Sequence, residues 1–199
     1  MVEALMADGT RVELRSDGTW TRVQPSGPIL EAGGFRRAKW GATRSEVKAS
    51  EGREPDGGVD NTLGYAVTIA GLSATALYIF VSDTLVRAKY IITEPHSDYA
   101  LNLRDFSALD QLLTSKYGEA IERNQFWSND LYEDSPQEYG LAVAAGHMTR
   151  YYQWSADDTN IWLVITGDNF DIDLQIEYVG KEFEELENGR TKAATLDDL

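Results

Sequence analysis

Apolar and polar residues alternate along three stretches in the middle of the chain, at residues 63–69, 75–81 and 85–93. A period of two predicts strands with one buried face. In the third stretch Arg87 and Lys89 are expected on one face. The residues expected on the opposite face are Val86, Ala88, Tyr90 and Ile92. Because only short turns separate these stretches, the pattern predicts an antiparallel meander.

Helix signals precede and follow this meander. Thr43-Arg44-Ser45-Glu46 forms a capping box, which satisfies free amides at a helix start, and Gly52 is expected to end that helix. A longer helix is expected from about Asp98 to Gly118. Its apolar stripe at helical spacing consists of Leu103, Phe106, Leu109, Leu112 and Leu113.

The second half of the chain has the same predicted order of elements. Residues 119–134 are predicted as a loop, and Ser135-Pro136-Gln137-Glu138 as a second capping box. Strands are expected at 148–155, 160–166 and 170–178, before a short helix that contains Phe183 and Leu186. A helix, three strands and another helix would thus occur twice, over 35–118 and 119–189, as a pseudo-repeat.

The first 24 residues are predicted as a separate three-stranded meander. Asp8-Gly9 and Asp17-Gly18 are hairpin turn signals, and Trp20 begins the third strand. Residues 25–34 contain Pro and Gly and are predicted as a linker, whereas 190–199 are predicted as a mobile tail. The fold class is therefore α+β, with antiparallel sheets covered by helices on one face. The alternative is one continuous sheet resembling the saddle of TATA-binding proteins.

Charge and composition exclude some functions. The 199 residues have a net charge of −15, of which −2 falls on residues 1–118 and −13 on residues 119–199. Such a field repels phosphate backbones, so no nucleic-acid partner is expected. The chain contains no cysteine, and no apolar run is long enough to predict a membrane span. The first residues do not predict a signal peptide, which leaves both an exported and a cytoplasmic protein open.

The residues from Phe35 to Val47, with the pattern F-R-x-x-x-W-G before a capped helix ending in E-V, resemble a motif of uncharacterised bacterial proteins. Lys116-Tyr117-Gly118 and Phe126-Trp127-Ser128-Asn129-Asp130 are similar to further parts of that pattern. A more distant likeness is to helix-plus-meander domains of the SmpA/OmlA type and to the tandem fold of the β-lactamase inhibitor protein. This resemblance implies a scaffold or binding role, by analogy of fold alone.

Two candidate sites point to an enzyme or a cation-dependent protein. His96 and Glu94 could form an acid–base pair, although a loop histidine is the simpler reading. His147 follows a predicted helix and is expected to interact with its dipole. Four carboxylates near one strand face offer oxygen ligands for Ca²⁺ or Mg²⁺, but a solvated face explains them equally. They are Asp168, Asp171, Asp173 and Glu177. No cofactor is expected.

Aromatic residues in the second half are the remaining candidates. If several shared a surface they could bind a peptide or a partner protein, although most are expected in the core. The candidate binding residues are Trp127, Tyr132, Tyr152 and Trp154. Trp127, in a polar context, is the first expected at the surface. The sequence thus favours a non-catalytic bacterial protein-interaction module over an enzyme that uses His96 or the Asp171/Asp173 face.

Overall fold

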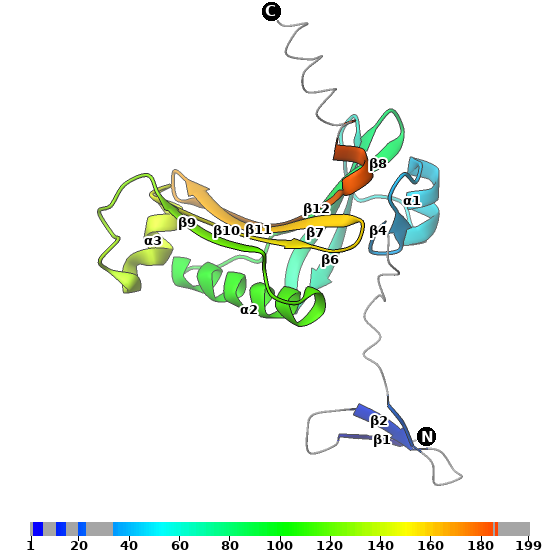
Figure 1. The fold of residues 1–199 in the computed structure, drawn as a ribbon, viewed down its shortest axis with the longest axis horizontal. Helices are drawn as coiled ribbons and strands as arrows, with labels where there is room; N and C mark the ends of the chain where they lie inside the picture. Colours follow the sequence, from blue (N-terminus) through cyan, green and yellow to red (C-terminus); the bar gives the residue numbers. More distant parts are fainter. Residues whose placement is uncertain (1, 6–10, 15–19, 23–33, 185, 187–199) are drawn as a thin grey trace, which may run out of the picture.

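The computed structural model describes residues 2–5, 11–14, 20–22, 34–184 and 186 (Figure 1). Strands β1 (Val2–Leu5), β2 (Arg11–Leu14) and β3 (Trp20–Arg22) form an antiparallel sheet in chain order, which confirms the predicted N-terminal meander. Its two predicted turns, the linker before Gly34 and the predicted tail lie outside the described residues.

Within the described residues, seven antiparallel strands form the main sheet, in the order β6-β7-β8-β12-β11-β10-β9. Their bounds are β6 (Thr62–Ile69), β7 (Leu72–Val81), β8 (Thr84–Ile92), β9 (Glu122–Trp127), β10 (Met148–Ser155), β11 (Thr159–Asp168) and β12 (Asp171–Gly180). The six strands expected from alternation are all confirmed. A separate short hairpin consists of β4 (Gly34–Phe35) and β5 (Ala38–Lys39).

The two meanders join through their last strands. Ala88 on β8 lies opposite Tyr178 on β12, and the pairing extends along both strands. One continuous sheet therefore runs through both halves, as the saddle-like alternative predicted. The pseudo-repeat itself stays a prediction.

The first helix, α1 (Arg44–Glu51), begins and ends as predicted. The Thr43 hydroxyl accepts the Glu46 amide, and the Glu46 carboxylate accepts the Thr43 amide at 2.8 Å. Gly52 ends the helix with φ of 69°, a left-handed conformation that suits glycine. The single buried residue of α1 is Val47, which faces the sheet.

The longest helix, α2 (Tyr99–Tyr117), has Asp98 as its N-cap and Gly118 after its last turn. The predicted stripe is wrong at Leu112, whose side chain is 53% exposed. Asp105 is buried instead, at 4% exposure. At about 100° per residue, Leu112 lies only about 20° around the helix axis from Asp105. The two residues therefore differ in their position along α2, Leu112 being about two turns closer to its C-terminal end.

Two predictions between α2 and β10 are wrong. Residues 122–127 form strand β9 rather than loop, because they pair with β10 along their whole length. Ser135 makes no side-chain capping bond, and the segment begins as the 3₁₀ helix η1 (Pro136–Glu138) before α3 (Tyr139–Ala144). Beyond β12, the 3₁₀ helix η2 (Lys181–Phe183) is followed by the exposed Leu186.

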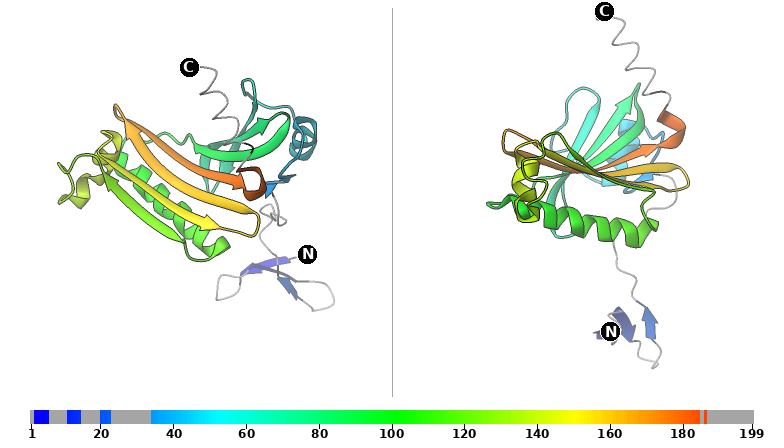
Figure 2. Two further views of the ribbon diagram at one scale, coloured as in Figure 1. Left: turned by 45° about the horizontal axis from the view of Figure 1, so that its top comes forward. Right: turned by 60° about the vertical axis from the view of Figure 1, so that its left-hand side comes forward.

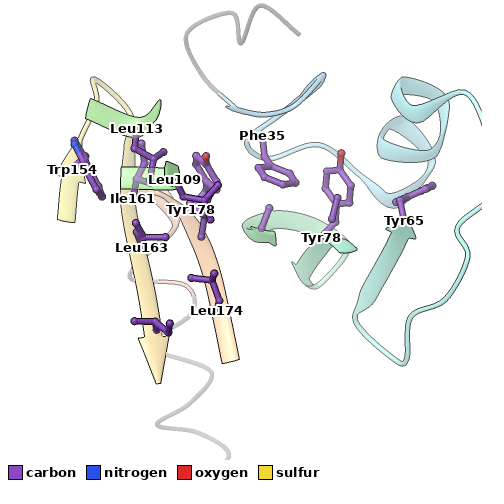
Figure 3. Packing of buried hydrophobic residues seen from close by; sticks show 14 of the residues in the cluster. Phe35, Tyr65, Tyr78, Leu109, Leu113, Trp154, Ile161, Leu163, Leu174 and Tyr178 are labelled. Atoms are coloured by element: carbon purple, nitrogen blue, oxygen red, sulfur yellow. The ribbon is translucent and has the colours of Figure 1, made fainter. Parts of the chain in front are cut away.

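One face of the sheet carries the core. Strand register places a single row of buried or small residues across five strands. This row is Tyr78, Ala88, Tyr178, Ile161 and Trp154. The β4–β5 hairpin and α1 cover the β6–β8 half, whereas α2 and α3 pack on β10–β12 (Figures 1 and 2). Figure 3 shows Phe35 and Tyr78 on one side of this core and Leu109, Leu113 and Trp154 on the other. In the described part of the chain, no helix is long and apolar enough to cross a membrane.

Candidate functional site

The two edges of the main sheet differ. At the β6 edge, residues 53–58 run alongside the strand. The Gly64 amide donates to the Gly57 carbonyl at 2.8 Å, and the Asp56 amide donates to the Gly64 carbonyl at 2.9 Å. Arg53 donates to the Ala66 carbonyl at 2.7 Å. At the β9 edge, no described residue pairs with the outer side of the strand. An uncovered edge exposes unpaired amides and carbonyls to an incoming strand.

Antiparallel geometry defines which β9 groups face outward. The Ser128 amide donates to the His147 carbonyl at 2.9 Å, so Ser128 faces β10. Backbone direction alternates along a strand. Asn124 and Phe126 therefore also direct their backbone groups at β10. Arg123, Gln125 and Trp127 direct theirs away from the sheet and offer three amides and three carbonyls.

An aromatic pair lies beside this edge, on the face opposite the helices. Phe126 stacks on Tyr151 of β10 with 5.6 Å between ring centroids and 19° between ring planes. Phe126 is nevertheless 53% exposed. The segment around β9 also carries Ile121 and Leu131, which are 60% and 65% exposed. The Phe126–Tyr151 stack therefore places one exposed aromatic surface beside the free strand edge.

The surroundings of β9 are acidic. Residues 119–138 contain six acidic residues and one basic residue, Arg123. Arg123 donates to both carboxylate oxygens of Asp110 on α2 at 2.7 Å, and this bonding raises the pKa of Arg123. Asp110 pairs with Arg123, and a second cation, Arg150 of β10, donates to the Gln125 side chain at 2.7 Å. The carboxylates of residues 119–138 still outnumber these two cations.

Two of the candidate aromatic residues are in the core beneath α2. Trp154 is 1% exposed, and its indole donates to the Gly118 carbonyl at 3.0 Å. The Tyr152 ring packs edge-on against Phe106 at 5.0 Å, with the Arg123 guanidinium 4.7 Å from its centroid. Their positions suit packing, because neither presents an open apolar surface.

The other two candidates lie where β9 meets the 128–147 segment. Trp127 packs edge-on against Tyr139 at 5.2 Å, and the Tyr132 ring stacks on His147 at 5.5 Å. The His147 Nδ1 atom is buried without a hydrogen-bond partner among the described residues. Trp127 is only partly exposed, and its neighbour Phe126 occupies the more open position. The four candidates therefore do not form one patch.

His96 has a different partner from the one expected. Its Nε2 lies 2.5 Å from the Asp105 carboxylate on α2, and both side chains are largely buried. Glu94 instead accepts the Ser73 amide at 2.9 Å, a bond that lowers the pKa of Glu94. Within the described residues, no hydroxyl nucleophile bonds to His96. The His96–Asp105 pair ties the loop before α2 to the helix.

The acidic strand face is partly neutralised. Glu177 forms ion pairs with Arg87 at 2.7 Å and Lys89 at 2.8 Å. Asp168 and Asp171 lie opposite each other at the β11–β12 turn, and burial raises the pKa of Asp173. Across the described ranges, no three carboxylate or histidine side chains come together as a metal site.

One buried polar cluster escaped sequence reasoning. Glu51, at the end of α1, accepts Arg36 Nε at 2.7 Å and also the Tyr78 hydroxyl. Burial, followed by the bond to Glu51, raises the pKa of Tyr78. The nearby Tyr65 hydroxyl is buried without a partner among the described residues. The cluster connects α1 and the β4–β5 hairpin to the sheet. Because Arg36 and Tyr78 lie 15 and 27 positions from Glu51 in the sequence, no local motif indicates the cluster.

In comparisons with known proteins, no family model, curated protein or solved structure matches the chain. The resemblance of residues 35–47 to uncharacterised bacterial proteins stays a prediction.

Proposed function

We propose that this chain is a non-catalytic protein-interaction module that binds an extended segment of a partner protein at the outer edge of β9. The incoming segment would become an eighth strand of the main sheet. In this mode backbone hydrogen bonds supply affinity, and alternate side chains supply specificity.

The contrast between the two sheet edges carries this proposal. Residues 53–58 bond to the outward backbone groups of Gly64 and Ala66 at the β6 edge. The edge at β9 is six residues long, and no described residue bonds to its outer side. Proteins usually cover, shorten or interrupt an edge strand, because an open one recruits other chains. The open edge beside Phe126 therefore supports a role for β9 in binding a partner strand.

The partner segment is expected to contain basic residues, Lys or Arg, that alternate with apolar residues. Lys and Arg side chains complement the acidic residues that surround β9. An apolar side chain of the partner would cover the exposed Phe126 ring on the open face. Charge would increase the association rate and exclude acidic segments, and the aromatic contact would provide affinity.

Selection from a phage-displayed library of random 12-residue peptides on the immobilised full chain tests the proposal. We expect enriched peptides to contain alternating apolar residues together with Lys or Arg. A synthetic peptide from the enriched set should bind Gln125→Pro at least about tenfold more weakly, because proline removes an outward amide.

Gln125→Ala is the matched control, since it removes the side chain and keeps the amide. It should bind the peptide nearly as the original chain does. Circular dichroism melting compares the folds of both variants. Failure to enrich any peptide, or equal binding to a folded Gln125→Pro variant, would contradict the proposal.

A further inference from the structure

A second surface, remote in sequence from β9, has the opposite charge. A groove of about 430 Å³ separates the β4–β5 hairpin from α1. Its lining includes two basic side chains of the hairpin segment, Arg37 and Lys39, and two residues of α1, Glu46 and Ser50. The groove lies in the segment that carries the F-R-x-x-x-W-G pattern.

Arg37 and Lys39 are exposed and form no ion pair with any residue that the structure describes. Their neighbour Arg36 differs, since it pairs with Glu51 at 2.7 Å. Glu46 lies in the same groove, but the amide and hydroxyl of Thr43 both bond to its carboxylate at 2.8 Å. Arg37 and Lys39 thus place two cations without an ion-pair partner among the described residues on the groove, beside one carboxylate.

Helix η2, the last labelled element before residues 187–199, lies next to this groove. Phe183 of η2 lies so close to Gly41 that a Cβ added there would be 3.1 Å from the phenyl ring. Gly41 itself lines the groove. A Cβ on Gly180 would also meet the Trp40 indole at 2.9 Å, so β12 and η2 pack directly on the groove segment.

Residues 187–199 follow and lie outside the described residues. These thirteen residues contain three acidic side chains, Glu187 and the adjacent pair Asp197 and Asp198, and two basic ones, at positions 190 and 192. Fully extended, they reach about 40 Å at roughly 3.3 Å per residue. A short tether raises the effective concentration of its own acidic residues into the millimolar range.

We infer that the groove between the β4–β5 hairpin and α1 is a carboxylate-binding site, and that its occupant is the Asp197-Asp198 pair of this chain. Asp197 and Asp198 supply the carboxylates, and Arg37 and Lys39 supply the cations. This site goes beyond the proposed β9 interaction and does not depend on it.

The absence of cysteine allows a specific test on the full chain. A nitroxide attached to Thr195→Cys broadens the NMR signals of amides within its reach. Amides of Gly41, Ala42 and Ser50 should broaden at low salt. The broadening should decrease as sodium chloride rises from about 20 to 500 mM, because exposed ion pairs are screened.

The double variant Arg37→Ser/Lys39→Ser should reduce the docked population roughly two- to thirtyfold, the effect of losing two exposed ion pairs. Arg104→Ser/Lys116→Ser on α2 is the matched control with the same loss of charge, and should leave the broadening unchanged. Absent broadening at the three groove amides would overturn the inference. Equal broadening in the two double variants would also overturn it.

Discussion

Phe126 stacks on Tyr151 across the β9–β10 pair, with 5.6 Å between the ring centroids, and still exposes about half of its surface. This relationship joins the free edge of the sheet to its open face. A partner strand at β9 would pass directly beside the Phe126 ring. The stacked pair is therefore expected to matter more for binding than for folding.

Replacing Phe126 tests that distinction. Phe126→Ala should lower the free energy of unfolding by about 1 kcal/mol or less, since the ring is half exposed and loses mainly one stacking contact. The same change should weaken binding of a selected peptide about tenfold, as expected for an aromatic anchor. Leu112→Ala, at an equally exposed site on α2, should leave peptide affinity unchanged. Calorimetry and urea unfolding measure the two effects; an unaltered affinity in Phe126→Ala would count against the β9 site.

Glu51 should be essential for stability. Glu51→Gln leaves Arg36 and the Tyr78 hydroxyl without their charged acceptor in a mostly buried site. We expect a loss of about 2–4 kcal/mol in the free energy of unfolding. Glu54→Gln removes an exposed partner of Lys48 and should cost less than about 1 kcal/mol. Similar unfolding midpoints in urea for the two variants would refute the role given to Glu51.

The His96–Asp105 pair is expected to be structural. His96→Ala leaves the buried Asp105 carboxylate without its closest partner, which should cost about 1–3 kcal/mol in unfolding free energy. Hydrolysis of p-nitrophenyl acetate should be the same for this variant and the original chain. An esterase activity that disappears in His96→Ala while stability is retained would support the alternative of an enzyme.

Buried tyrosines predict a loss of stability in alkali. Burial raises the pKa of Tyr117 to about 12 in the folded chain, from about 10 in the unfolded chain. The unfolded state therefore loses this proton first, so the contribution of Tyr117 is complete below pH 10 and disappears as pH rises toward 12. Urea unfolding between pH 9 and 11.5 should show this decline. Tyr117→Phe should show a shallower decline, and an identical slope would contradict the assignment.

Alternation and capping predicted most of the main sheet because both are local signals. The capping box at Thr43 and the strands on both sides of Ala88 follow from residues a few positions apart. Strand β9 was missed because its sequence, Glu-Arg-Asn-Gln-Phe-Trp, is polar over its first four residues. Such a strand is held by backbone pairing with β10, which no residue pattern reports.

The sequence patterns did not reveal contacts between residues that are not close neighbours in the chain. Asp105, the partner of His96, lies nine positions away and interrupts what would otherwise be an apolar helix face. Trp127 was expected at the surface from its polar neighbours, but in a strand consecutive side chains face opposite sides. Once β9 is a strand, Phe126 faces the open side and Trp127 packs on Tyr139.

Residue-resolved amide hydrogen exchange of the full chain tests the β9 edge most directly. In the free protein the amides of Arg123, Gln125 and Trp127 should exchange rapidly, whereas those of Asn124 and Phe126 should be protected. Saturation with a selected basic peptide should slow exchange at all three outward amides. Outward amides that are already protected in the free chain, or that exchange equally fast with the peptide bound, would contradict strand addition at β9.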